Sequence, residues 1–162
     1  MLLSGGGPYE SRRLLLGEAV RGAIAAPVCR LARMSAERIG FVDRAFDLVL
    51  CIQNGISAFK VDARALVDEA VRVTRPGGRV LVSSYAPKIW EARLGWFRAQ
   101  AAAGLVGEID ETATGGGVIV CRDGFTARTV TEAEFTSLTA HLQTRPAIHE
   151  VAESSVFCEI HV

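Results

Sequence analysis

Apolar residues dominate the run from Phe46 to Ile52, and this run is the clearest strand pattern in the chain. A continuous apolar run, in place of alternation, is typical of a strand that is covered on both faces. A similar run extends from Arg79 to Ser84. Between the two, apolar residues at helical spacing predict a helix from about Asp62 to Thr74, and the sequence from Arg75 to Gly78 predicts a turn. The pattern therefore predicts a βαβ unit with two parallel strands.

The remaining pattern predicts further alternation of helices and strands. Helices are expected at Ser11–Ala25, from Pro87 to about Ala103, and after Thr131 through Leu142; strands are expected at Pro27–Ala32, Val118–Cys121, Phe125–Val130, Ile148–Ala152 and Ser155–Ile160. Asp123 and Gly124 predict a hairpin turn, and Thr131 with Glu134 predicts a capping box. The last two strands are expected to be antiparallel. Together these elements predict an α/β fold, a doubly wound and mostly parallel sheet in one domain over residues 1–162.

Composition narrows the classes of function. The chain has 162 residues, with 18 basic and 18 acidic side chains, and this balance argues against a nucleic-acid partner, which would require a basic excess. A hydrophobic share of 49% excludes disorder. No stretch approaches the roughly 20 apolar residues of a membrane span, and the N-terminus lacks a signal-peptide pattern. The expected location is the cytoplasm.

The cysteines and histidines are dispersed along the chain. The four cysteines have no C-x-x-C spacing, and the three histidines lie far apart in its last quarter. A metal site requires a cluster of such side chains, so neither a metal site nor a disulfide is expected. Cysteines in apolar runs, such as Cys51, are expected to pack as small hydrophobic residues.

Loops at the carboxyl ends of the strands are the expected ligand site, because ligands of open α/β sheets bind there. This expectation directs attention to the loops Ser4–Glu10, Gln53–Phe59 and Ser83–Lys88. The first loop contains Gly5, Gly6 and Gly7 and precedes a predicted helix. Glycines allow close approach of the backbone to a ligand, and a helix N-terminus favours anionic or polar groups.

Two motifs resemble class I S-adenosylmethionine-dependent methyltransferases. The strand Phe46-Asp47-Leu48-Val49-Leu50-Cys51 is one, and the sequence Arg75-Pro76-Gly77-Gly78-Arg79-Val80-Leu81, after a helix that contains Glu69 and Arg72, is the other. The resemblance extends from about Ala36 to Val162 and is greatest to methyltransferases of small molecules. It implies a Rossmann-like fold, S-adenosylmethionine as cofactor and a small-molecule acceptor.

The resemblance also implies roles for particular residues. The cofactor-binding residues would be Gly5, Gly6, Gly7, Ser35, Ala36, Cys51, Gln53, Asn54 and Gly55, and the acceptor would contact Asn54 and Tyr85. Gly5 to Gly7 would hold the methionine part of the cofactor, and Ser35 and Ala36 would border its adenine. Asn54 also fits ordinary turn chemistry, so both interpretations stay open. No catalytic residue is assigned, because methyl transfer depends mainly on holding the two reactants in line.

Several positions depart from the family pattern. Leu3 replaces an acidic residue before the glycines, Tyr9 replaces a third glycine, and Ser35 replaces an acidic residue. A βαβ unit needs about 30 residues, and the interval from Gly5 to Phe46 is too short for the family's full set of elements. The acidic residue that would bind the ribose hydroxyls is missing there. Three explanations stay open: a fold that is shortened near the second strand, an internal deletion, or completion by a partner chain, for example in a homodimer.

Three hypotheses about function follow. The leading one is methyl transfer from S-adenosylmethionine to a small molecule. The alternative is a methyltransferase-like domain that has lost cofactor binding and acts as an interaction or scaffold subunit, which the departures at Leu3, Tyr9 and Ser35 favour. A nucleotide-binding oxidoreductase is the third, and the lack of a G-x-G-x-x-G followed by a ribose-binding acid argues against it.

Overall fold

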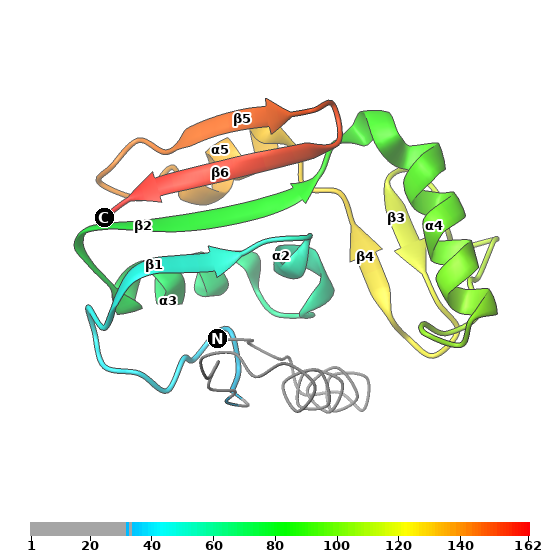
Figure 1. Ribbon diagram of the computed structural model, residues 1–162, viewed down its shortest axis with the longest axis horizontal. Coiled ribbons are helices and arrows are strands. Elements are labelled where there is room, and N and C mark those ends of the chain that lie inside the picture. The colour runs from blue at the N-terminus through cyan, green and yellow to red at the C-terminus, as the bar shows by residue number, and fades with distance from the viewer. Residues whose placement is uncertain (1–31, 33) are drawn as a thin grey trace, which may run out of the picture.

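The computed structural model describes Ala32 and residues 34–162 of the chain (Figure 1). The glycines Gly5, Gly6 and Gly7, the helix expected at Ser11–Ala25 and most of the strand expected at Pro27–Ala32 lie outside the described residues.

The main sheet has four strands in the order β1-β2-β6-β5. These strands are β1 (Phe46–Cys51), β2 (Thr74–Tyr85), β6 (Ser155–His161) and β5 (Ala147–Val151). β1 and β2 are parallel, as the βαβ pattern predicts, and β6 is antiparallel to both β2 and β5. The predicted terminal antiparallel pair and the α/β fold class are thereby confirmed, and the described sheet is mixed.

Three helices pack on one face of this sheet: α2 (Gly55–Ala58), α3 (Ala63–Val73) and α5 (Glu132–Thr139). Asp62 is the N-cap residue of α3, and its carboxylate accepts a hydrogen bond from the N–H of Ala65. The main core lies between these helices and the sheet, and its largest fully buried side chains include Val67, Val73, Val80, Val82, Phe135 and Ile160. The predicted helix over Asp62–Thr74 is confirmed to within a residue at each end.

The expectation that β1 is covered on both faces is wrong in the described part of the chain. Val49 and Cys51 are buried, whereas Leu48 is 53% exposed and Leu50 is 49% exposed. Successive side chains of a strand point to opposite faces, and the helices α3 and α5 cover only the face that holds Val49 and Cys51. A run of apolar residues cannot by itself distinguish one covered face from two.

A smaller unit follows β2 and consists of η1 (Pro87–Ile89), α4 (Trp90–Ala102), β3 (Val118–Val120) and β4 (Thr126–Arg128). Figure 1 shows α4 and the hairpin β3–β4 beside the main sheet, beyond the end of β2. They enclose a second apolar cluster of Leu94, Phe97, Ile109, Ile119, Cys121 and Ala127. The hairpin predicted from the Asp-Gly turn is confirmed, and Gly124 has the positive φ of 84° that this turn requires.

The predicted capping box at α5 is confirmed: the Thr131 side chain accepts from the N–H of Glu134, and the Glu134 carboxylate accepts from the N–H of Thr131. The helix is shorter than expected, because it ends at Thr139. Leu142 lies in a following turn, where its N–H donates to the carbonyl of Thr139. Among the described helices, none combines the length and apolar character that a membrane crossing needs.

Candidate functional site

The loop after β1 lies at the carboxyl ends of the two parallel strands. Gln53 and Asn54 both adopt left-handed backbone conformations, with φ of 56° and 64°. Two hydrogen bonds fix this loop on β2: the N–H of Gln53 donates to Oγ of Ser83 over 3.0 Å, and the N–H of Asn54 donates to the carbonyl of Ser83 over 3.2 Å. Left-handed conformations are unfavourable for residues other than glycine and gather at ligand sites, so this loop is a candidate part of the site.

Asn54 is buried, with 2% of its surface exposed. Its Oδ1 accepts from Oγ of Ser84 over 2.8 Å, and its Nδ2 donates to Oγ of Ser57 over 3.0 Å. Oγ of Ser84 also accepts from the N–H of Val130 over 2.8 Å. Asn54 therefore links the β1 loop, β2 and the segment that leads into α5, and its side chain is directed to the interior of the protein.

Cys51 and Gly55 flank this loop at close range. A Cβ atom on Gly55 would lie 3.0 Å from Sγ of Cys51 and 3.1 Å from the ring of Phe59. Burial raises the pKa of Cys51 to about 12, so the thiol is protonated at neutral pH and is a poor nucleophile. These two residues bring the backbone of the loop close to the core.

Side chains of α3 hold the segment with Ser35 and Ala36 in place. Ala36 is fully buried in the main core. The N–H of Ile39 donates to Oε2 of Glu69 over 2.7 Å, and the guanidinium of Arg72 donates to the carbonyl of Ile39 over 2.8 Å. Glu69 and Arg72 are themselves paired at 2.7 Å, and this hydrogen bond from Arg72 is the main reason that the pKa of Glu69 is below its ordinary value.

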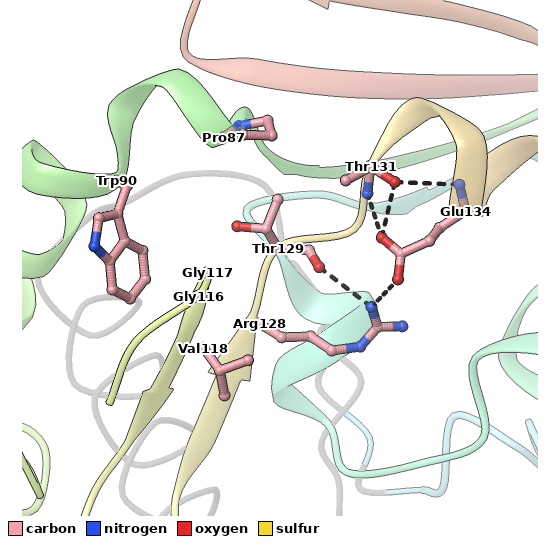
Figure 2. Close-up of a pocket in the computed structure, with 9 residues that line it drawn as sticks. All are labelled: Pro87, Trp90, Gly116, Gly117, Val118, Arg128, Thr129, Thr131 and Glu134. Atoms are coloured by element: carbon pink, nitrogen blue, oxygen red, sulfur yellow. Dashed lines mark hydrogen bonds and ion pairs between the residues drawn. The ribbon is translucent and has the colours of Figure 1, made fainter. Parts of the chain in front are cut away.

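A pocket of about 380 Å³ opens beyond the end of β2. Figure 2 shows its lining: Pro87, Trp90, Gly116, Gly117, Val118, Arg128, Thr129, Thr131 and Glu134. These residues come from η1, the start of α4, the hairpin β3–β4 and the N-terminus of α5. The volume is within the range of roughly 300–1,000 Å³ that is common for small-molecule sites.

The walls of this pocket combine apolar and charged groups. Trp90 supplies an aromatic wall, and Arg128 and Glu134 form an ion pair at another side of the pocket (Figure 2). Partial burial raises the pKa of Glu134, but hydrogen bonds from Thr131 and Arg128 outweigh this effect and leave the pKa below its ordinary value. Glu134 is therefore ionised at neutral pH and balances the charge of Arg128.

Tyr85, the last residue of β2, and Arg93 of α4 lie close to the pocket. The guanidinium of Arg93 lies 4.9 Å from the centre of the Tyr85 ring, and the Tyr85 ring makes an edge contact with Trp96. Arg93 donates to Oγ1 of Thr129 over 3.0 Å, to the carbonyl of Gly117 over 3.3 Å and to the carbonyl of Ala127 over 3.0 Å. Burial lowers the pKa of Arg93 to about 10, so its side chain stays charged at neutral pH.

The structure gathers some of the residues suggested by the sequence. Cys51, Gln53, Asn54 and Gly55 lie in one loop at the carboxyl end of β1, hydrogen-bonded to Ser83 and Ser84 of β2. Tyr85 is at the end of β2 and is not one of the residues that line the pocket. Ser35 and Ala36 lie on a separate segment held by α3. Gly5, Gly6 and Gly7 lie outside the described residues. Their roles in binding stay predictions.

Sequence reasoning missed several lining residues of the pocket. It assigned no binding role to Trp90, Arg128 or Thr129. The capping box of Thr131 and Glu134 was a usable signal, but its position beside Trp90 depends on the tertiary structure. In the described part of the chain, no group of three or more His, Cys, Asp and Glu side chains could hold a metal ion.

A known protein family matches part of the chain. Residues 14–82 match the model of a family described as methyltransferase domain. This match includes β1, α3 and most of β2, and therefore both sequence motifs. No curated protein sequence matches the chain significantly.

Several solved structures have a similar fold. An S-adenosylmethionine-dependent methyltransferase of Methanosarcina mazei is 17% identical, with a TM-score of 0.62 and coverage of 97% of this chain and 78% of that chain. A putative S-adenosylmethionine-dependent methyltransferase of Methanococcus maripaludis is 11% identical, with a TM-score of 0.59 and coverage of 98% and 64%. A third structure, the 1,6-didemethyltoxoflavin-N1-methyltransferase of Burkholderia thailandensis with bound 1,6-didemethyltoxoflavin and S-adenosylhomocysteine, is 12% identical, with a TM-score of 0.51 and coverage of 97% and 68%.

The chain has the fold of class I S-adenosylmethionine-dependent methyltransferases. The family match over residues 14–82 and the structural matches together confirm the resemblance seen in the sequence.

Proposed function

We propose that this protein transfers a methyl group from S-adenosylmethionine to a small-molecule acceptor. The observation that carries this proposal is the backbone-fixed loop Gln53–Gly55 at the carboxyl end of β1, with the pocket of about 380 Å³ beyond the end of the neighbouring strand β2. Ligands of α/β sheets bind at this edge. The methyltransferase fold supports the choice of cofactor, because one matched methyltransferase holds S-adenosylhomocysteine.

The loop directly after β1 offers a cofactor an exposed side chain on a fixed backbone. Gln53 has an exposed side chain on a left-handed residue directly after β1, while Ser83 fixes its backbone. Gln53, Asn54 and Gly55 would line the reaction side of the cofactor, Ser35 and Ala36 would border its adenine, and Gly5, Gly6 and Gly7 would hold its methionine part.

The sulfonium of the bound cofactor supplies an electrophilic methyl group. The contribution of the protein would be to hold the acceptor in line with it and to exclude water. Trp90, Pro87 and Val118 would cover the acceptor, and Tyr85 and the loop of Asn54 would define the side from which the acceptor attacks the methyl group. Glu134 is fully engaged by Thr131 and Arg128, so its main role would be to shape the pocket.

The narrower aspects of the proposal rest on the sequence. We propose a single domain over residues 1–162, a cytoplasmic location and a homodimer. Small molecules, and not nucleic acids, are the proposed partners, because basic and acidic side chains are equal in number. The mass in solution tests the assembly: a homodimer would have twice the chain mass of 17.3 kDa. A mass of one chain at micromolar concentration would exclude it.

Calorimetric titration with S-adenosylhomocysteine tests the cofactor. We expect a saturable heat with a dissociation constant in the micromolar range, and no heat at millimolar ligand would overturn the proposal. Gly6→Trp is expected to abolish this heat without unfolding the protein. Gly95→Trp is the matched control, because Gly95 is exposed on α4 with nothing within 4 Å of an added Cβ; its affinity should equal that of the wild type.

A further inference from the structure

Arg93 is a buried cation that lacks a carboxylate partner among the described residues. Its side chain is 2% exposed, and its hydrogen-bond acceptors are the carbonyls of Gly117 and Ala127 and the hydroxyl of Thr129. Its Nε is buried and has no acceptor in this part of the chain. Burying a charge is costly unless an opposite charge or a set of hydrogen bonds offsets it. The rings of Tyr85 and Phe97 offset part of this cost.

The charge of Arg93 reaches the pocket through Thr129. Because Oγ1 of Thr129 accepts from the guanidinium over 3.0 Å, its own O–H must donate in another direction. No acceptor for this O–H is present among the described residues, and Thr129 lines the pocket. In Figure 2 its hydroxyl points toward the side of Trp90. A hydroxyl that accepts from a cation is a stronger donor to the next group, because hydrogen bonds in a chain polarise one another.

The surroundings of Thr129 leave this donor open to a ligand. Gly117 has φ of 86°, and a Cβ at this position would lie 3.4 Å from Oγ1 of Thr129, so the missing side chain keeps the hydroxyl accessible. The other cation of the pocket, Arg128, is paired with Glu134. Arg128 therefore has a carboxylate partner, whereas Arg93 has none among the described residues.

We propose that the pocket selects a flat, carboxylate-bearing aromatic acceptor, whose carboxylate accepts a hydrogen bond from Thr129 while its ring lies against Trp90. This inference rests on the proposed function and adds the class of acceptor. The carboxylate supplies the negative charge that Arg93 lacks, and the aromatic wall and a volume of about 380 Å³ suit a ring of one or two cycles. Thr129 is the specificity-determining residue, and Arg93 is a positioning residue that acts through it.

Benzoate and benzamide are suitable probes, because they have the same shape and differ in charge. In the variant Trp96→Phe, Trp90 is the only tryptophan of the chain, so its fluorescence reports the pocket. We expect benzoate to change this fluorescence in a saturable way and benzamide to bind at least tenfold more weakly. Equal binding of the two probes, or no saturable change with benzoate up to tens of millimolar, would overturn the proposal.

Substitutions in the same background test the assigned residues. Thr129→Val keeps the shape and removes the hydroxyl, and we expect it to weaken benzoate binding at least tenfold. Because the buried Arg93 loses one acceptor, we also expect a lower melting temperature, with the variant still folded under the conditions of the binding assay. Thr136→Val on the exposed side of α5 is the matched control and should bind as the parent does. Arg93→Lys keeps the charge but loses the planar array of donors, and we expect weaker benzoate binding and unaltered benzamide binding. Parental affinity for benzoate in Thr129→Val would refute the role of Thr129.

The test separates this inference from the proposed function. S-adenosylhomocysteine titrated calorimetrically into Thr129→Val should bind as it does to the parent, because Thr129 contacts the acceptor and not the cofactor. Cofactor binding without selective benzoate binding would refute only the acceptor class. Selective benzoate binding without cofactor binding would support the pocket and overturn methyl transfer. Equal effects of benzoate and inorganic phosphate would indicate a general anion site and would also refute the proposal.

Discussion

Gly78 is a residue at which an added methyl group would meet backbone atoms. A Cβ atom there would lie 2.8 Å from the carbonyl oxygen of Asp47 and 2.9 Å from that of Arg75. This contact explains the second glycine of the Pro-Gly-Gly motif, which lets β2 approach β1 at the start of their pairing. We expect Gly78→Ala to lower the free energy of unfolding by about 2 kcal/mol or more, since inserting a methyl group into a packed site costs about 1–3 kcal/mol. Urea denaturation measures this change.

Gly95→Ala is the control for this substitution. Gly95 lies within α4, and a Cβ there would meet nothing within 4 Å. Alanine is favoured over glycine within a helix by about 0.5–1 kcal/mol, so this variant should be slightly more stable than the wild type. Comparable stability of Gly78→Ala and wild type would show that the two strands are less close at this point than the structure places them.

At the scale of elements, the segment from Ser35 to Arg44 depends on α3. It contains no strand or helix, and its backbone is instead bound by Glu69 and Arg72, with further hydrogen bonds from Arg72 to the carbonyl of Phe41 and to Asp43. Buried backbone groups outside regular structure need such partners. The motif residues Glu69 and Arg72 therefore fix the segment that is expected to border the adenine.

Glu69→Gln is expected to destabilise the protein by about 1–3 kcal/mol at pH 7, because an amide cannot accept from Arg72 and Ile39 together without directing N–H groups at one of them. The loss should depend on pH. The folded-state pKa of Glu69 is lowered, mainly by Arg72, so its stabilisation is present above the ordinary glutamate pKa and is lost as the pH falls through the lowered folded-state value. Urea denaturation at pH 7 and below pH 4 should show that the difference between variant and wild type shrinks in acid.

Glu91→Gln is the control for the pH series. Glu91 is exposed in the first turn of α4, and its substitution should change stability by less than about 0.5 kcal/mol. If the difference between Glu69→Gln and wild type were the same at both pH values, the ionised state of Glu69 would not contribute to the clamp.

At the scale of the whole molecule, the described chain has two apolar clusters. The main core lies under the four-stranded sheet, and the second lies between α4 and the hairpin β3–β4. The pocket is lined mainly by residues of the smaller unit and by the start of α5. Because each cluster has its own buried residues, we expect the smaller unit to open locally without unfolding of the sheet.

Ile119→Ala is the variant that reveals this division. Ile119 is fully buried in the second cluster, and removing its side chain costs about 2–5 kcal/mol in well-packed sites. We expect hydrogen exchange to accelerate in α4, β3 and β4, with much smaller changes in β1 and β2. Benzoate binding should weaken in parallel, since this cluster supports the wall of the pocket.

Val82→Ala provides the contrast, because Val82 is fully buried in the main core. Its substitution should accelerate exchange throughout the sheet and the smaller unit together. A uniform loss of protection in Ile119→Ala as well would mean that the two clusters unfold as one cooperative unit.

Local sequence rules predicted much of the fold. The Asp-Gly turn, the capping box of α5, the helix α3 and the parallel pair β1 and β2 all follow from short-range patterns, and the structure contains each of them. The burial of β1 could not be predicted in this way. An apolar side chain such as Leu48 is compatible with either a covered or an uncovered face, and only the positions of the helices decide between them.

The candidate site depended on contacts between distant residues. The sequence by itself determined the class of fold and the loop after β1, because each of the motifs and turns on which these rest is a short contiguous segment of the chain. Only the tertiary structure decided that Asn54 is held inward by Ser84, 30 residues later, and that Arg93 of α4 meets Thr129 of the hairpin region, 36 residues later. The physical reason is that a buried polar group must find a partner, and which partner it finds depends on how the whole chain packs.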